Sequence, residues 1–83
     1  MKLTFRHRFT DGRRAIMTMR GANGQPRVQW PDGIPDAEPA RSEYCAWMLT
    51  ALQEAANHYG RQIFYVLPTD DGVATATIVP ATP

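Results

Sequence analysis

Two segments in which apolar and polar residues alternate, residues 2–10 and 14–20, flank an Asp11-Gly12 dipeptide near the start of the chain. Alternation with a period of two is typical of a half-buried β-strand, and an Asp-Gly pair between two such segments is a strong hairpin signal. We therefore expect the chain to begin with two paired antiparallel strands, onto which the rest of the fold is built.

The length of the hairpin loop decides which side chains share a face. A two-residue loop would place apolar residues opposite charged ones and mix the two faces. A three-residue loop with Gly12 in the left-handed conformation instead pairs Phe5 with Met17 and leaves one apolar and one basic face. In this register, which we expect, Arg8 opposes Arg14, and solvent or an anion must relieve their repulsion.

The rest of the chain supplies one more strand, one helix and two final strands. Asp36 or Ser42 is expected to cap the helix start, and Gly60 to end the helix. The order βββαββ predicts an α+β fold with about five mostly antiparallel strands and one helix packed on one face of the sheet. The expected elements are a strand at 27–30, an irregular Pro-rich connection at 31–39, a helix from about 40 to 59, a strand at 62–67, a turn at 69–72 and a strand at 73–79.

The helix should cover the apolar side of the sheet with one stripe of side chains. At 100° per residue, the members of this stripe are Cys45, Met48, Leu49, Leu52, Ala55, Ala56 and Tyr59. Beside the stripe, Tyr44 and Trp47 form an aromatic flank that is wider than a helix on a sheet needs. Such residues can anchor an interface, or they can pack beneath the neighbouring 31–39 connection.

Chain length and composition predict one domain. Eighty-three residues suffice for a single core, so we expect one domain over residues 1–83 with 80–83 as a flexible tail. No apolar run is long enough to span a membrane, and Arg6 and Arg8 interrupt the region where a signal peptide would be apolar. The single Cys45 fits a reducing compartment. We expect a cytoplasmic protein with no membrane partner.

Charge is divided unevenly along the chain. Residues 1–30 carry seven basic residues and one acidic residue, whereas residues 31–83 carry two basic and seven acidic residues. This asymmetry predicts either an anionic partner or mutual attraction of the two halves. Because one helix covers one face, the basic face must be solvated, paired in a homodimer or bound to a partner. The candidate partner-binding residues are Arg6, Arg8, Arg14 and Arg20 on the sheet, and Tyr44 and Trp47 on the helix.

The residue types that carry chemistry each have a sufficient structural role. Cys45 and His7 could form a nucleophile pair, but Cys45 lies in the apolar stripe and His7 suits a core or edge position. His58 near the helix end suits the helix dipole. The acidic pairs lie in loops, and no phosphate-binding loop, calcium loop or zinc motif occurs. We expect no catalytic residue, no metal site and no cofactor.

A three-stranded sheet followed by a helix, over residues 1–59, resembles the plant AP2-type and integrase arm-binding DNA domains. The resemblance implies a sheet that lies in the major groove of DNA. The resemblance is limited to the order of the strands and the helix. The two strands after the helix are absent from those domains, and no functional residue is carried over.

These features favour a small non-catalytic interaction protein that binds another macromolecule, with a protein or protein complex preferred. In size and layout the chain resembles phage or mobile-element inhibitors of host machinery, including anti-CRISPR proteins. The alternative is a nucleic-acid-binding module that uses the Arg-rich sheet face. The partner's identity and the pathway do not follow from these residues.

Overall fold

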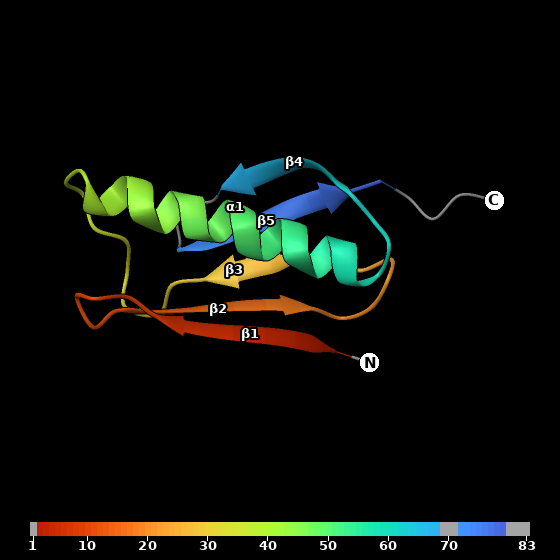
Figure 1. Cartoon of the computed structure of the whole chain (residues 1–83), viewed down its shortest axis with the longest axis horizontal. Coiled ribbons are helices and arrows are strands. Elements are labelled where there is room, and N and C mark those ends of the chain that lie inside the picture. The colour runs from red at the N-terminus through yellow and green to blue at the C-terminus, as the bar shows by residue number, and fades with distance from the viewer. Residues whose placement is uncertain (1, 69–71, 80–83) are drawn as a thin grey trace.

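Five antiparallel strands form one sheet in the order β1-β2-β3-β5-β4, and a single helix lies across one face of it (Figure 1). The computed structural model describes residues 2–68 and 72–79. This architecture confirms the predicted α+β fold. The elements are β1 (Leu3–Arg8), β2 (Arg14–Met19), β3 (Arg27–Gln29), α1 (Ala40–His58), β4 (Ile63–Pro68) and β5 (Val73–Ile78).

The β1–β2 hairpin has the register that the three-residue loop predicts, with Phe5 opposite Met17. The Phe9 backbone N–H donates to the Arg13 carbonyl at 2.9 Å, and the Gly12 N–H donates to the Phe9 carbonyl at 2.9 Å. Gly12 adopts a φ of 87°, in the left-handed region that its place in the loop requires. Apolar side chains of both strands therefore share the face beneath α1.

Gly12→Ala is expected to lower the free energy of unfolding by about 1–2 kcal/mol, because an L side chain is disfavoured at this positive φ. An added Cβ would meet no atom within 4 Å, so the cost is backbone strain and not a clash. Urea titration measures this loss of unfolding free energy, provided that the m-value is the same for both proteins. Gly21→Ala is the control, because Gly21 has equally open space and no positive φ. Equal stability of the two variants would refute the strain argument.

The final two strands join the hairpin through β3. β5 pairs with β3 on one side and with β4 on the other, so β1 and β4 are the edge strands. A register shift between Ile63 and Tyr65 marks a bulge at the start of β4. Residues 31–39 form neither helix nor strand, as expected. Most of the turn predicted at 69–72 and the tail predicted at 80–83 lie outside the described residues.

The buried stripe of α1 is turned toward its aromatic flank. Its buried members are Tyr44, Met48, Ala51, Leu52, Ala55 and Ala56. The expectation that Cys45 and Leu49 lie in the core is wrong, since Cys45 is exposed and Leu49 is 51% exposed. The cause is Phe9 in the β1–β2 connection, whose ring stacks on Tyr44 with centroids 3.7 Å apart. Turning the helix to make this stack carries Cys45 and Leu49 outward.

The helix begins at Ala40 and ends before Gly60, as predicted, but the residue expected to cap its start does not do so. The prediction that Asp36 or Ser42 caps the start is wrong, because the first turn is held by Glu38, whose carboxylate accepts from the Ser42 backbone N–H at 3.3 Å and from the Ser42 hydroxyl. The predicted end at Gly60 is confirmed. Gly60 has a φ of 71°, and the Arg61 N–H donates to the Ala56 carbonyl at 2.8 Å, as in a Schellman motif.

Among the described residues, no helix combines the length and the apolar character that crossing a membrane requires.

Candidate partner-binding surface

The sheet face opposite α1 is rich in arginine. The pairs Arg6–Ile16 and Arg8–Arg14 lie on this side, because the alternate residues of both strands face the helix. We call the following residues of β1–β3 and their flanks the basic face: Lys2, Thr4, Arg6, Arg8, Arg14, Ile16, Thr18, Arg20, Arg27 and Gln29. The four arginines predicted from the sequence as partner-binding residues thus share one surface.

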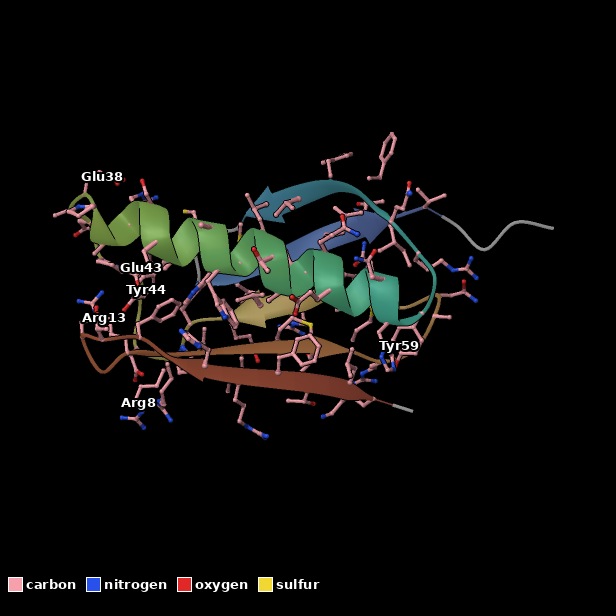
Figure 2. The ribbon with its side chains drawn as sticks, viewed as in Figure 1. Arg8, Arg13, Glu38, Glu43, Tyr44 and Tyr59 are labelled. Carbon is pink, nitrogen blue, oxygen red and sulfur yellow. The ribbon has the colours of Figure 1, made fainter. Side chains whose placement is uncertain are left out.

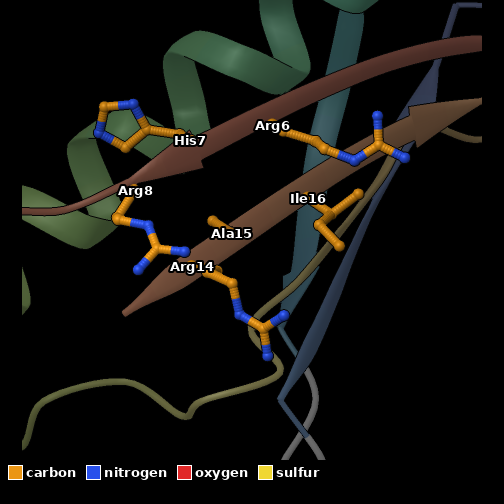
Figure 3. Close-up of a pocket in the computed structure, with 6 residues that line it drawn as sticks. All are labelled: Arg6, His7, Arg8, Arg14, Ala15 and Ile16. Carbon is orange, nitrogen blue, oxygen red and sulfur yellow. The ribbon is translucent and has the colours of Figure 1, made fainter. Parts of the chain in front are cut away.

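Two open hollows lie on the basic face. The first, of about 270 Å³, is lined by the Arg6, Arg8 and Arg14 side chains and by half-buried Ile16, which lies beside Arg6 and Arg14 (Figure 3). His7 also lines this hollow, but its ring lies on the helix side of β1, where it stacks on Trp47 at 5.3 Å. The second hollow lies further along the strands and is lined by Lys2, Thr18, Arg20, Gly24, Gln25, Arg27 and Gln29. Each hollow therefore presents several cations to one ligand.

Within the described part of the chain, Arg14 is the arginine of the basic face that forms an ion pair. Its Nε and Nη2 donate to the two carboxylate oxygens of Asp32 at 2.9 and 3.0 Å, and its backbone N–H donates to Asp32 Oδ2 at 2.9 Å. These bonds, together with the charges of Arg14 and Arg8, lower the pKa of Asp32 to about 2. The contact ties the connection after β3 to the start of β2.

The other cations of the basic face lack such partners. Within residues 2–68 and 72–79, ion pairs join Arg13 to Asp11 and Arg14 to Asp32, and no other basic side chain of this face has one. Arg8 opposes Arg14 directly, as the register predicts. Like charges in this arrangement destabilise a sheet, and Asp32 relieves part of this repulsion, because it binds Arg14 and also interacts with the charge of Arg8. The cations of this face that lack an ion pair are the groups that suit it to an anion.

The tip of the basic hairpin is anchored to the helix. Asp11 accepts hydrogen bonds from the Arg13 backbone N–H at 2.9 Å and from the Tyr44 hydroxyl. The Tyr44 hydrogen bond is the main reason that the pKa of Asp11 is lowered. Burial, and then the Asp11 carboxylate, raise the pKa of Tyr44 to about 12. Asp11 and Asp32 thus hold the hairpin from two sides, while Arg8 points away from α1 (Figure 2).

The predicted aromatic flank is only partly a surface. Tyr44 is 2% exposed, so the expectation that it lies on an outer flank is corrected: it packs on Phe9 in the core. Trp47 is half-buried between His7 and Phe9, with ring centroids 5.3 and 5.8 Å away. The arginines and the aromatic pair therefore do not form one site. Most of the candidate surface lies on the sheet.

The cysteine and histidine side chains that could carry chemistry do not lie together. Cys45 is exposed on α1, and His58 lies edge-on against Tyr59 at 5.0 Å. Across the described part of the chain, no three His, Cys, Asp or Glu side chains come close enough together to hold a metal ion.

Sequence reasoning missed the role of Asp32. It stands in a Pro31-Asp32-Gly33 turn signal, which suggested only a bend in the backbone. A usable clue was the pairing of β3 with β2, because a turn that follows β3 must pass close to the start of β2, where Arg14 lies.

No protein-family model, curated protein or solved structure matches this chain.

Proposed function

We propose that this chain is a small non-catalytic interaction protein of the cytoplasm that binds an acidic surface of another protein through its basic face. The observation that carries the proposal is a set of arginines on the sheet face opposite α1 that form no ion pair with any described residue. Guanidinium groups bind carboxylates with two parallel hydrogen bonds, and arginine is enriched at protein interfaces while lysine is depleted. Lys2 is the single lysine of the chain.

The hollow around Ile16 favours a protein over a purely phosphate-bearing partner. Ile16 is half-buried and lines the same hollow as Arg6, Arg8 and Arg14, so the hollow combines an apolar side chain with cations. Interfaces between proteins have this organisation, with an apolar anchor surrounded by polar contacts. A protein segment that places an aliphatic side chain beside two carboxylates would match it.

A nucleic acid is the second candidate, and one observation favours it. Most cations of the basic face lie on β1, β2 and their flanks, and a two-stranded ribbon is a shape that the major groove of DNA admits. Thr4 and Thr18, opposite each other on this ribbon, could add hydrogen bonds to phosphate oxygens.

Affinity capture from a lysate of the source cell, with and without nuclease, tests the proposal. We expect a defined protein to be retained in equal amounts with and without nuclease, because its carboxylates bind the arginines without a nucleic-acid bridge. Loss of all captured material after nuclease treatment would support the second candidate. In that case, affinity for DNA should fall with a slope of log K against log salt of roughly −4 to −5, as five unpaired cations imply.

Binding without chemistry is also how inhibitors encoded by phages or mobile elements act on host machinery, anti-CRISPR proteins among them. The support for this setting is the small size of the domain and its single dominant surface. The identity of the captured protein decides whether host machinery is the target.

A further inference from the structure

The second hollow of the basic face gathers three cations around one space. Thr18 on β2 pairs with Arg27 on β3, and Arg20 follows Thr18 on the same face of the sheet. Lys2 and Arg20 lie beside each other at the open end of the β1–β2 hairpin, beyond its last pair. Lys2, Arg20 and Arg27 all line the hollow. Their positive charges therefore act on whatever occupies it.

The described part of the chain does not neutralise these charges. Within residues 2–68 and 72–79, Lys2, Arg20 and Arg27 form no ion pair, and none of the lining residues is acidic. The first hollow differs, because Asp32 binds its Arg14. Like charges that share one space repel one another. An anion is therefore favoured more strongly in the second hollow than in the first.

The remaining side chains of the second hollow are neutral hydrogen-bonding groups, namely the hydroxyl of Thr18 and the amides of Gln25 and Gln29. The first hollow contains the apolar side chain of Ile16 instead. The second hollow has a volume of about 360 Å³. A cavity of roughly 150 Å³ already holds a benzene ring, so a phosphate group fits with room for water. The lining thus suits a compact polar anion.

The number of cations distinguishes between anions. A carboxylate or a phosphodiester carries a single negative charge, whereas a phosphate monoester carries about −1.5 to −2 at pH 7 and offers three acceptor oxygens. Arginine binds phosphate with two parallel hydrogen bonds, and arginine clusters are a recurring means of recognising phosphorylated side chains. Three cations in one hollow therefore match a phosphate monoester better than a singly charged group.

We propose that the second hollow binds the phosphate group of a phosphorylated serine or threonine on the protein partner. The inference rests on the proposed function and makes it more specific. Ile16 of the first hollow and Thr18 of the second are two residues apart on β2, so one segment of the partner can reach both hollows. Its carboxylates and aliphatic side chain contact the first hollow, and its phosphate occupies the second.

NMR titration of the whole chain with N-acetyl-O-phosphoserine amide tests the site. We expect saturable shifts of the backbone amides around the second hollow at millimolar ligand. Arg20→Gln and Arg27→Gln should each weaken binding roughly 10-fold, because each removes a charge-assisted hydrogen bond. Both side chains are exposed, so the fold should remain intact. Arg41→Gln makes the same change of net charge on exposed α1 and should leave binding unchanged.

Two results of the titration would overturn the proposal. Equal affinity for dimethyl phosphate would show that a singly charged diester suffices, which favours a nucleic-acid backbone as the ligand. Shifts that do not saturate, or equal weakening by Arg41→Gln, would show only general attraction between the protein and anions.

Affinity capture from phosphatase-treated lysate separates this inference from the proposed function. Loss of the captured protein after phosphatase treatment, together with its loss in Arg20→Gln, is the result that we expect. Capture that survives the phosphatase would overturn the phosphate site and leave the binding of an acidic surface intact. Absence of any captured protein from untreated lysate would instead refute the proposed function, and with it the partner assigned here.

Discussion

Arg8→Glu is expected to abolish capture of the partner while leaving the melting temperature nearly unchanged. Arg8 faces Arg14 across the hairpin, and Asp32, which binds Arg14, also interacts with the charge of Arg8. A glutamate at this position can attract Arg14 but repels Asp32, so the two effects on stability offset each other at this exposed site. The same change places a negative charge where an acidic partner binds, which costs affinity through repulsion. Binding should therefore be lost while stability is retained.

The matched control for this experiment is Arg41→Glu, because it makes the same change of charge on the first turn of α1, away from the basic face. Capture by the control should stay close to that of the unmodified chain. If Arg41→Glu weakens capture as much as Arg8→Glu does, only net charge matters and the basic face is not the site. If Arg8→Glu lowers the melting temperature substantially, Arg8 has a structural role that the register does not reveal.

The hairpin was predictable because local chemistry determines it. The left-handed Gly12 and the alternation of side chains on both sides select one loop length, and the loop length determines that Phe5 meets Met17. The end of α1 at Gly60 follows from equally local chemistry. The prediction that Arg8 opposes Arg14, and with it the basic face, depends on these short-range effects alone.

The rotation of α1 was not predictable, because it depends on a contact between distant residues. A hydropathy pattern ranks Cys45 and Leu49 above Tyr44 for burial. The structure instead buries Tyr44, since Phe9 offers a stacking partner and Asp11 accepts the hydroxyl hydrogen bond. Neither contact can be inferred from the helix sequence. For this reason the sequence predicted a larger exposed area for the aromatic flank than the structure has.

The position of β4 was also beyond sequence reasoning. The apolar run Ile63–Pro68 predicts a strand, yet a continuous apolar run is typical of a strand buried on both faces. The structure places this strand at the sheet edge because β5 inserts between β3 and β4. Strand order is a global property, and it is this order that leaves Phe64 exposed on an edge strand.

Tyr44→Ala is expected to lower the melting temperature by more than about 10 °C, the largest stability effect that we predict. The change removes the ring that covers Phe9 and the hydroxyl that holds Asp11, so the hairpin tip loses its contact with α1. Tyr44→Phe keeps the stack and loses only the hydrogen bond, so its melting temperature should lie between those of Tyr44→Ala and the unmodified chain. Equal melting temperatures for Tyr44→Phe and Tyr44→Ala would show that the stack contributes little.

The same tyrosine should make stability fall in alkaline solution. Because burial and Asp11 raise the pKa of Tyr44 from 10.0 to about 12, the fold favours the neutral hydroxyl. This contribution is fully present below about pH 10 and is lost as the pH rises toward about 12, where the folded protein must also release the proton. Urea titrations at several pH values should therefore show the advantage of the unmodified chain over Tyr44→Phe shrinking across this window. Tyr65→Phe, at an exposed ring, should show no such change, and a constant advantage of Tyr44 from pH 8 to 12 would contradict the assigned hydrogen bond.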